Sequence, residues 1–213
     1  MYKIMCGLFF FLSSLTSCSY IYYNFWETLG LEKRDLLKRN ISQAQEAQKD
    51  SQEAFASTLD KIQALYGLEG GELESAYRSL SKEYEAAEEA ANDLKERSAS
   101  VQSIAQDLFA EWREEAESMH HSQMKNQSLA RLKETEKRFQ EMKVAMQAAE
   151  ETMEPVLMTM RDHVLYLKHN LNAMALSSFK KEFSSIQSDI KKLIESMNRS
   201  IQQSDRFLQT LNS

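Results

Sequence analysis

Apolar and small residues recur along most of the chain at alternating steps of four and three. Such steps keep one face of an α-helix turned toward a partner helix. The first run predicts a helix over residues 31–66, with polar groups at Gln48 and Ser51 in the middle of its seam. The full seam is Leu37, Ile41, Ala44, Gln48, Ser51, Phe55, Thr58, Ile62 and Leu65.

The same steps continue without a break through residues 72–120 and predict a second helix. At about 1.5 Å per residue, this helix is on the order of 70 Å long. Its seam is Leu73, Tyr77, Leu80, Tyr84, Ala87, Ala91, Leu94, Ser98, Val101, Ala105, Leu108, Trp112, Glu115 and Met119.

Residues 128–170 repeat at steps of seven and predict a third helix. Pro155, the only proline, lies inside it. Because proline removes a backbone hydrogen bond and disfavours helix in the residue before it, we expect a kink or short interruption near Glu154. Such a break would account for a change of flanking positions after Ala149. The repeat is Leu132, Phe139, Met146, Met153, Met160 and Leu167, flanked first by Met142 and Ala149 and then by Leu157, Val164 and Leu171.

Residues 173–208 predict the last helix, and three segments without a seam separate the four helices. Glycine allows a tight reversal at 67–71, polar residues fill 120–127, and asparagine can replace glycine in a left-handed conformation at 169–172. The apolar positions of the last helix are Leu176, Phe179, Phe183, Ile186, Ile190, Leu193, Met197 and Ile201.

Four helices with short connections pack as antiparallel neighbours. The sequence therefore predicts an all-α fold, an elongated antiparallel four-helix coiled-coil bundle over residues 31–213. The absence of glycine after Gly71 supports this fold, because sheets need turns that draw on glycine and proline. The first and third connections should lie at one end. The two middle helices are the longest, so their connection should project from the other end.

The beginning of the sequence has the features of an export signal. Lys3 precedes a short apolar run, and residues 15–18 (Leu-Thr-Ser-Cys) resemble the bacterial lipoprotein box, whose cysteine receives a lipid. We expect residues 1–17 to be removed and residues 18–30 to form a tether lipidated at Cys18. An uncleaved membrane anchor over residues 4–26 is the alternative. Both interpretations place the rest of the chain outside the cytoplasm.

The tether is rich in aromatic residues. Two interpretations stay open: the rings contact the membrane–water boundary, or they cover the base of the bundle. Ser19 follows the lipidated cysteine, and by resemblance to other bacterial lipoproteins a residue other than Asp here implies the periplasmic face of the outer membrane. The aromatic residues are Tyr20, Tyr22, Tyr23, Phe25 and Trp26.

Cysteine content and charge exclude several classes of function. Cys6 and Cys18 are the only cysteines, so the mature chain would have no thiol for catalysis or metal binding. Without residues 1–17 it has 25 basic and 32 acidic residues, which argues against a nucleic-acid partner.

The charge is unevenly distributed along the chain. Residues 72–117 carry 13 acidic and 5 basic residues, whereas residues 118–213 carry 11 acidic and 14 basic residues. Opposite charges favour packing within one chain, and a homo-oligomer is a further hypothesis.

No residue pattern indicates catalysis or a cofactor, so we expect a protein that is not an enzyme. Glu117 and His120 have the Glu-x-x-His spacing of di-iron bundles, but such a site needs two motifs and two further glutamates. We therefore predict no metal site. Two other groups of residues need no functional explanation. Partly exposed charge beside a seam accounts for the first group, and core packing accounts for the second. These groups are Glu136, Lys143 and Glu150 beside the third seam, and the methionines from Met119 to Met174.

Five short segments distinguish this chain from a generic coiled coil. They are residues 30–35 (GLEKRD), 69–74 (EGGELE), 108–112 (LFAEW), 153–157 (MEPVL) and 165–173 (LYLKHNLNA). With these segments the mature chain resembles a family of lipoproteins from Gram-negative bacteria that is known only as a domain of unknown function. The resemblance implies an envelope location and a helical fold, and it supplies no catalytic residues.

Together these features predict a non-enzymatic, lipid-anchored periplasmic protein that acts as a protein-interaction or structural coiled-coil module. The expected partners are the membrane, through the lipid, and another envelope protein. The alternative is a bundle that binds a small ligand or metal between its helices. The candidate interaction pole combines the two least generic turns, although helix capping alone would also explain them. It comprises Glu69, Gly70, Gly71, Glu72, Lys168, His169, Asn170 and Asn172.

Overall fold

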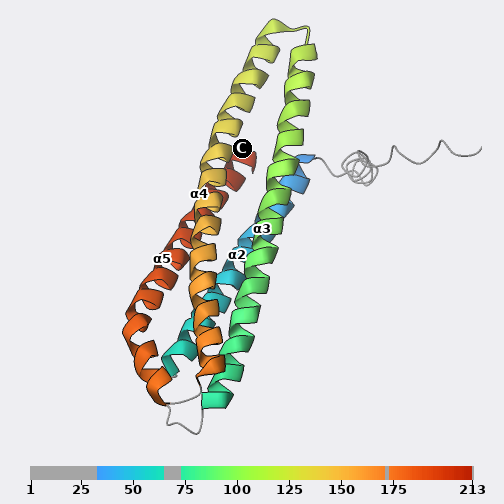
Figure 1. Ribbon diagram of the computed structural model, residues 1–213. Coiled ribbons are helices and arrows are strands. Elements are labelled where there is room, and N and C mark those ends of the chain that lie inside the picture. The colour runs from blue at the N-terminus through green and yellow to red at the C-terminus, as the bar shows by residue number, and fades with distance from the viewer. Residues whose placement is uncertain (1–32, 65–72, 171–172, 213) are drawn as a thin grey trace, which may run out of the picture.

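Four long helices make up the part of the chain that the computed structural model describes, which is residues 33–64, 73–170 and 173–212. They are α2 (Lys33–Ala64), α3 (Leu73–Ser118), α4 (Ser122–His169) and α5 (Ala173–Asn212), shown in Figure 1. No strand occurs among these described residues. The predicted all-α bundle is confirmed.

The helices form a closed ring of neighbours. Each helix packs against the next along the chain, and α5 returns to pack against α2. Successive helices run in opposite directions along an elongated bundle (Figure 1). The heptad pattern left this packing order open, because a seam shows which face is buried but not which helix covers it.

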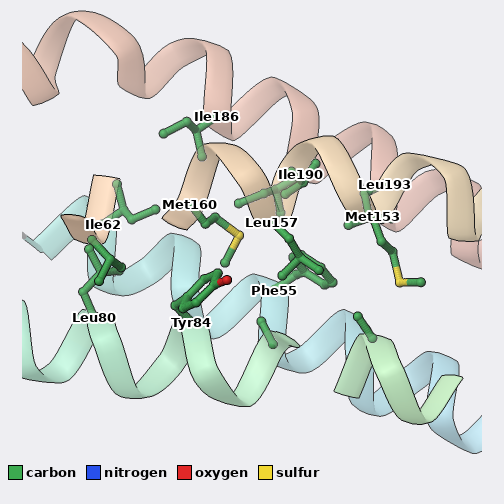
Figure 2. Close-up of a cluster of buried hydrophobic side chains, with 14 of the residues drawn as sticks. Phe55, Ile62, Leu80, Tyr84, Met153, Leu157, Met160, Ile186, Ile190 and Leu193 are labelled. Atoms are coloured by element: carbon green, nitrogen blue, oxygen red, sulfur yellow. The ribbon is translucent and has the colours of Figure 1, made fainter. Parts of the chain in front are cut away.

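Two hydrophobic clusters fill the interior, and all four helices contribute to both. Figure 2 shows part of the first, where Phe55, Leu80, Met160 and Ile190 point into the space between the helices. In the second, Phe139 packs edge-on against Phe109 and Phe207, with ring centroids 5.4 Å apart in each pair. Edge-to-face packing of this kind adds about 0.5–1.5 kcal/mol per pair to the effect of burial.

The seam of α2 agrees with its prediction at every described position. All eight predicted residues from Leu37 to Ile62 are buried, including Gln48 and Ser51. In the seam predicted for residues 72–120, Tyr77, Leu108 and Trp112 are only partly buried, and the last two positions are wrong. Glu115 and Met119 are exposed, and Ala116 is buried instead. The small side chain of Ala116 gave a weaker hydrophobic signal than Met119.

α4 runs without interruption through Pro155, so the predicted interruption near Glu154 is wrong, while the alternative of a kink stays a prediction. Pro155 lies on the exposed face of α4, as does Glu151, the residue to whose carbonyl a proline cannot donate a hydrogen bond. The flanking positions of the heptad repeat also do not shift after Ala149. Val156 and His163 are buried at the positions that continue the heptad, while Leu157 and Val164 are buried beside them. The continuous seam is Leu132, Thr135, Phe139, Met142, Met146, Ala149, Met153, Val156, Met160, His163 and Leu167.

α5 extends to Asn212, four residues beyond the predicted end at 208. The four-three steps pass through two buried serines, Ser200 and Ser204, and reach Phe207 and Leu211. Ile201 was predicted in the seam but is only partly buried. The prediction ended this seam too early because Ser200 and Ser204 are polar, and a polar residue usually marks the end of a buried helix face.

The connection between α3 and α4 occupies only residues 119–121, so the predicted connection over 120–127 is wrong. His121 caps α4, and its Nδ1 accepts a hydrogen bond from the backbone N–H of Met124 at 3.5 Å. The α3–α4 hairpin extends past the start of α2 and the end of α5, as predicted (Figure 1). Trp112 Nε1 donates a 2.9 Å hydrogen bond to Ser128 Oγ and joins the two helices of this hairpin.

Candidate functional site

The end of the bundle opposite this hairpin, called the pole below, is where α2 and α4 end and where α3 and α5 begin (Figure 1). The helix ends that flank the first and third predicted turns therefore lie together. Lys168 and His169 are exposed there, and Asn170 is half-buried. The remaining predicted pole residues lie outside the described residues, as does Cys18. Those residues are Glu69, Gly70, Gly71, Glu72 and Asn172.

Asn170 ends α4 in a way the sequence did not predict. Its φ of −132° is not left-handed. Instead, its backbone N–H donates to the carbonyl of Leu167 at 3.2 Å, and its side-chain amide donates to the carbonyl of Tyr166 at 3.0 Å. These bonds satisfy two of the carbonyl groups that a helix end leaves open. Next to this cap, Leu165 and Tyr166 are 41% and 40% exposed.

A group of buried polar residues, called the polar waist below, lies where the two hydrophobic clusters meet. It comprises Gln48, Ser51, Ser98, Ser200 and Ser204. The amide of Gln48 donates a 2.7 Å hydrogen bond to Ser200 Oγ, and Ser51 Oγ donates to the carbonyl of Ala90 at 3.0 Å. Polar positions in a coiled-coil core reduce stability and fix the register of the helices. The polar waist therefore has a clear structural role in aligning α2 with α3 and α5.

Glu150 of α4 lies half-buried beside the polar waist, near Ser98 of α3. Among the described residues, neither Glu150 Oε1 nor Ser98 Oγ makes a well-aligned hydrogen bond, although both atoms are buried. Burial raises the pKa of Glu150, while the nearby Ser98 hydroxyl and Lys95 ammonium oppose that rise. Burial at this position therefore disfavours the ionised form of the Glu150 carboxyl group.

The structure also shows where the other candidate residues from the sequence lie. Glu117 and His120 are both exposed near the α3–α4 connection, and the described residues contain no group of three or more His, Cys, Asp or Glu that could hold a metal ion. Glu136 forms an ion pair with Arg113, and Lys143 is half-buried. Core packing was predicted for the methionines from Met119 to Met174, and it is confirmed for Met142, Met146, Met153 and Met160 but wrong for the exposed Met119, Met124 and Met158.

Sequence reasoning missed His163, which is only 6% exposed within the first cluster. It also missed an outer row of apolar residues on α4, which lies outside the buried seam of that helix. Val144, Met158 and Leu165 are all exposed and lie at multiples of seven residues. That spacing was readable in the sequence and could have revealed a second face.

The geometry defines an all-α four-helix bundle with a polar waist, an exposed pole and a helix that is apolar on two faces. A family model described as "Protein of unknown function (DUF2959)" matches residues 22–211. The chain therefore belongs to the DUF2959 family. A comparison with curated proteins finds no match. Within the described helices, none combines the length and hydropathy that a membrane crossing requires.

Proposed function

We propose that this protein is lipid-anchored at Cys18 on the periplasmic face of the outer membrane and binds another envelope protein through its pole. It has no catalytic role in this proposal. The lipoprotein box at residues 15–18 supports the anchor and its location. Exposed apolar side chains beside charged ones at the pole support the interaction.

The observation that carries the interaction is the combination of exposed residues at the end of α4. Leu165 and Tyr166 present apolar surface directly beside the cationic side chain of Lys168 and the imidazole of His169. Interfaces between proteins typically surround an apolar or aromatic centre with polar groups. Capping explains why Asn170 ends the helix, but it does not require Leu165 or Tyr166 to be exposed.

Photocrosslinking in intact cells tests the interaction. A photoreactive amino acid replaces His169 in the full chain, and the same residue replaces Glu89, an exposed position in the middle of α3, as the control. We expect a discrete adduct from His169 that is absent from Glu89. Identical patterns at both positions, or no adduct from His169, would contradict the proposal.

Metabolic labelling with a radioactive fatty acid tests the anchor separately. The wild-type chain should incorporate label and fractionate with the outer membrane. Cys18→Ser should incorporate none and leave the membrane fraction. Incorporation that persists in Cys18→Ser would instead favour a retained anchor or another acylation site.

Binding of a small ligand or metal between the helices is the second candidate function. Ser98 of the polar waist and the neighbouring Glu150 favour it most, because each has a buried polar atom without a well-aligned hydrogen bond. Elemental analysis and native mass spectrometry of the purified full chain test this function. A stoichiometric metal or a bound small molecule lost in Glu150→Ala would support it, whereas the apoprotein mass alone would oppose it.

A further inference from the structure

The outward face of α4 carries a second heptad seam, called the outer stripe below. Its apolar members are Val144, Ala148, Pro155, Met158 and Leu165, all exposed. Val144 is 54% exposed and Met158 is 61% exposed, so neither is covered by α3 or α5. From Val144 to Leu165 the stripe extends along the helix for about 32 Å, at 1.5 Å per residue. α4 is therefore apolar on the face toward the bundle and on the face away from it.

The spacing of the outer stripe indicates the shape of what would cover it. Residues at steps of four and three along one helix face form the ridge and holes that receive the side chains of another helix. A sheet edge or an extended peptide would not match this period. A helix lying along α4 would contact each apolar member in turn.

Two carboxylates within the stripe indicate the charge of that helix. Glu151 and Asp162 occupy seam positions between the apolar members, and both are exposed. In the described part of the chain neither forms a salt bridge. A purely apolar partner would cover both carboxylates without a compensating charge, which disfavours such a partner. A partner with Lys or Arg at the facing positions would pair them.

The same two residues argue against a second copy of this chain. If two α4 helices pair antiparallel with Met158 facing the partner's Pro155, Glu151 faces the partner's Asp162. If they pair parallel and in register, each carboxylate faces its own counterpart. Like charges that face each other across an interface cost stability, so these two symmetric arrangements are disfavoured.

From these observations we infer that the outer stripe of α4 binds a basic amphipathic helix of another protein. The inference rests on the proposed function and deepens it, because the stripe ends at Leu165 beside the pole. The partner helix would place apolar side chains against Met158 and Leu165, and cationic side chains against Glu151 and Asp162. Its recognition would weaken with salt, since the paired charges stay close to solvent.

Photocrosslinking from Met158 in intact cells tests the stripe, with Met124 as the matched control. Both are methionines of α4 with similar exposure, 61% and 58%, but Met124 lies near the α3–α4 connection outside the stripe. We expect an adduct from Met158 and none from Met124. Mass spectrometry of the crosslinked peptide should place it in an amphipathic segment with Lys or Arg between its apolar residues.

A charge-reversal experiment is the second test of the outer stripe. The double variant Glu151→Lys/Asp162→Lys should reduce the Met158 adduct at least tenfold. The control Glu89→Lys/Glu96→Lys makes the same change in net charge on an exposed face of α3 and should leave the adduct unchanged. Circular dichroism should show the same helicity and melting behaviour for both variants. Equal loss in both would overturn the inference, because only the overall charge would then matter.

The outcomes separate this inference from the proposed function. An adduct from His169 with none from Met158 overturns the outer stripe and leaves the pole interaction intact. An adduct from Met158 with none from His169 overturns the pole interaction and leaves the outer stripe intact. A Met158 adduct at twice the mass of the chain identifies a second copy and overturns the basic helix. A crosslinked peptide without basic residues also overturns it.

Discussion

The side-chain amide of Gln48 on α2 donates a 2.7 Å hydrogen bond to the hydroxyl of Ser200 on α5, and both residues are at least 99% buried. This bond connects the first and last helices of the ring near the boundary of the two hydrophobic clusters. Ser196 and Ser204 lie about one helical turn to either side of Ser200 and are also buried, so polar positions continue along this face of α5. The bond satisfies a buried donor and a buried acceptor, which would each cost stability if left without a partner.

Ser200→Ala should destabilise the bundle by about 1–3 kcal/mol, because it leaves the buried amide of Gln48 without an acceptor. Gln48→Leu/Ser200→Ala should recover most of that loss, since both polar groups are then gone. Urea unfolding of the two single variants, the double variant and the wild type measures the coupling between the residues. Strictly additive free energies would show that the bond does not matter.

Glu150→Gln should change how stability depends on pH. Burial raises the pKa of Glu150 above the ordinary value of 4.5, so the folded state disfavours the ionised form. Its contribution to stability is then greatest below pH 4.5 and is lost as pH rises through the pKa of the folded state. We expect Glu150→Gln to be more stable than the wild type at about pH 7, with the difference fading toward about pH 4.

Urea unfolding at several pH values measures this difference. Glu151→Gln is the matched control, because it removes the same charge from the next residue, which is exposed. If both variants change stability equally at every pH, burial of Glu150 has no role.

His121→Asp should stabilise the protein by about 0.5–1 kcal/mol and raise its melting temperature by about 1–4 °C. The imidazole of His121 accepts its capping bond at a long 3.5 Å. A carboxylate is a better acceptor at this position and also complements the positive end of the helix dipole. His120→Asp introduces the same charge one residue earlier, outside the cap, and should have a smaller effect in a thermal melt.

Leu211→Ala should cost about 2 kcal/mol, near the lower limit for a buried leucine, because the helix end can relax. Leu211 is 4% exposed against the second cluster, only two residues before the end of the sequence. The exposed neighbour Gln209 provides the control substitution, Gln209→Ala, which should be close to neutral. Equal stability of the two variants by urea unfolding would show that the last turn of α5 contributes no packing.

The fold was readable from the sequence because helical periodicity records which face of a helix is buried. The seam of α2 could be predicted through polar Gln48 and Ser51, since the four-three steps continue past them. The errors have a common physical origin. Small or polar residues such as Ala116, Ser200 and Ser204 can occupy seam positions when the helices approach closely, and hydrophobicity alone does not identify them.

The candidate sites were less predictable. Pro155 suggested an interruption, but its position on the exposed face allows the helix to continue. His163 lies in the buried seam of α4 between Met160 and Leu167, but a polar residue at such a position gives no hydrophobic signal. Which helix covers which face depends on contacts between distant residues, such as Gln48 and Ser200, and no local pattern contains that information.

The orientation of α2 has a mechanical consequence. α2 begins at Lys33, toward one end of the bundle, and the pole lies at the opposite end (Figure 1). A pull between these two ends would act parallel to the helix axes. It would have to slide the helices past one another and break contacts in both clusters at once, instead of peeling off one helix at a time. The bundle would therefore carry such a load in shear, over the full length of its interfaces.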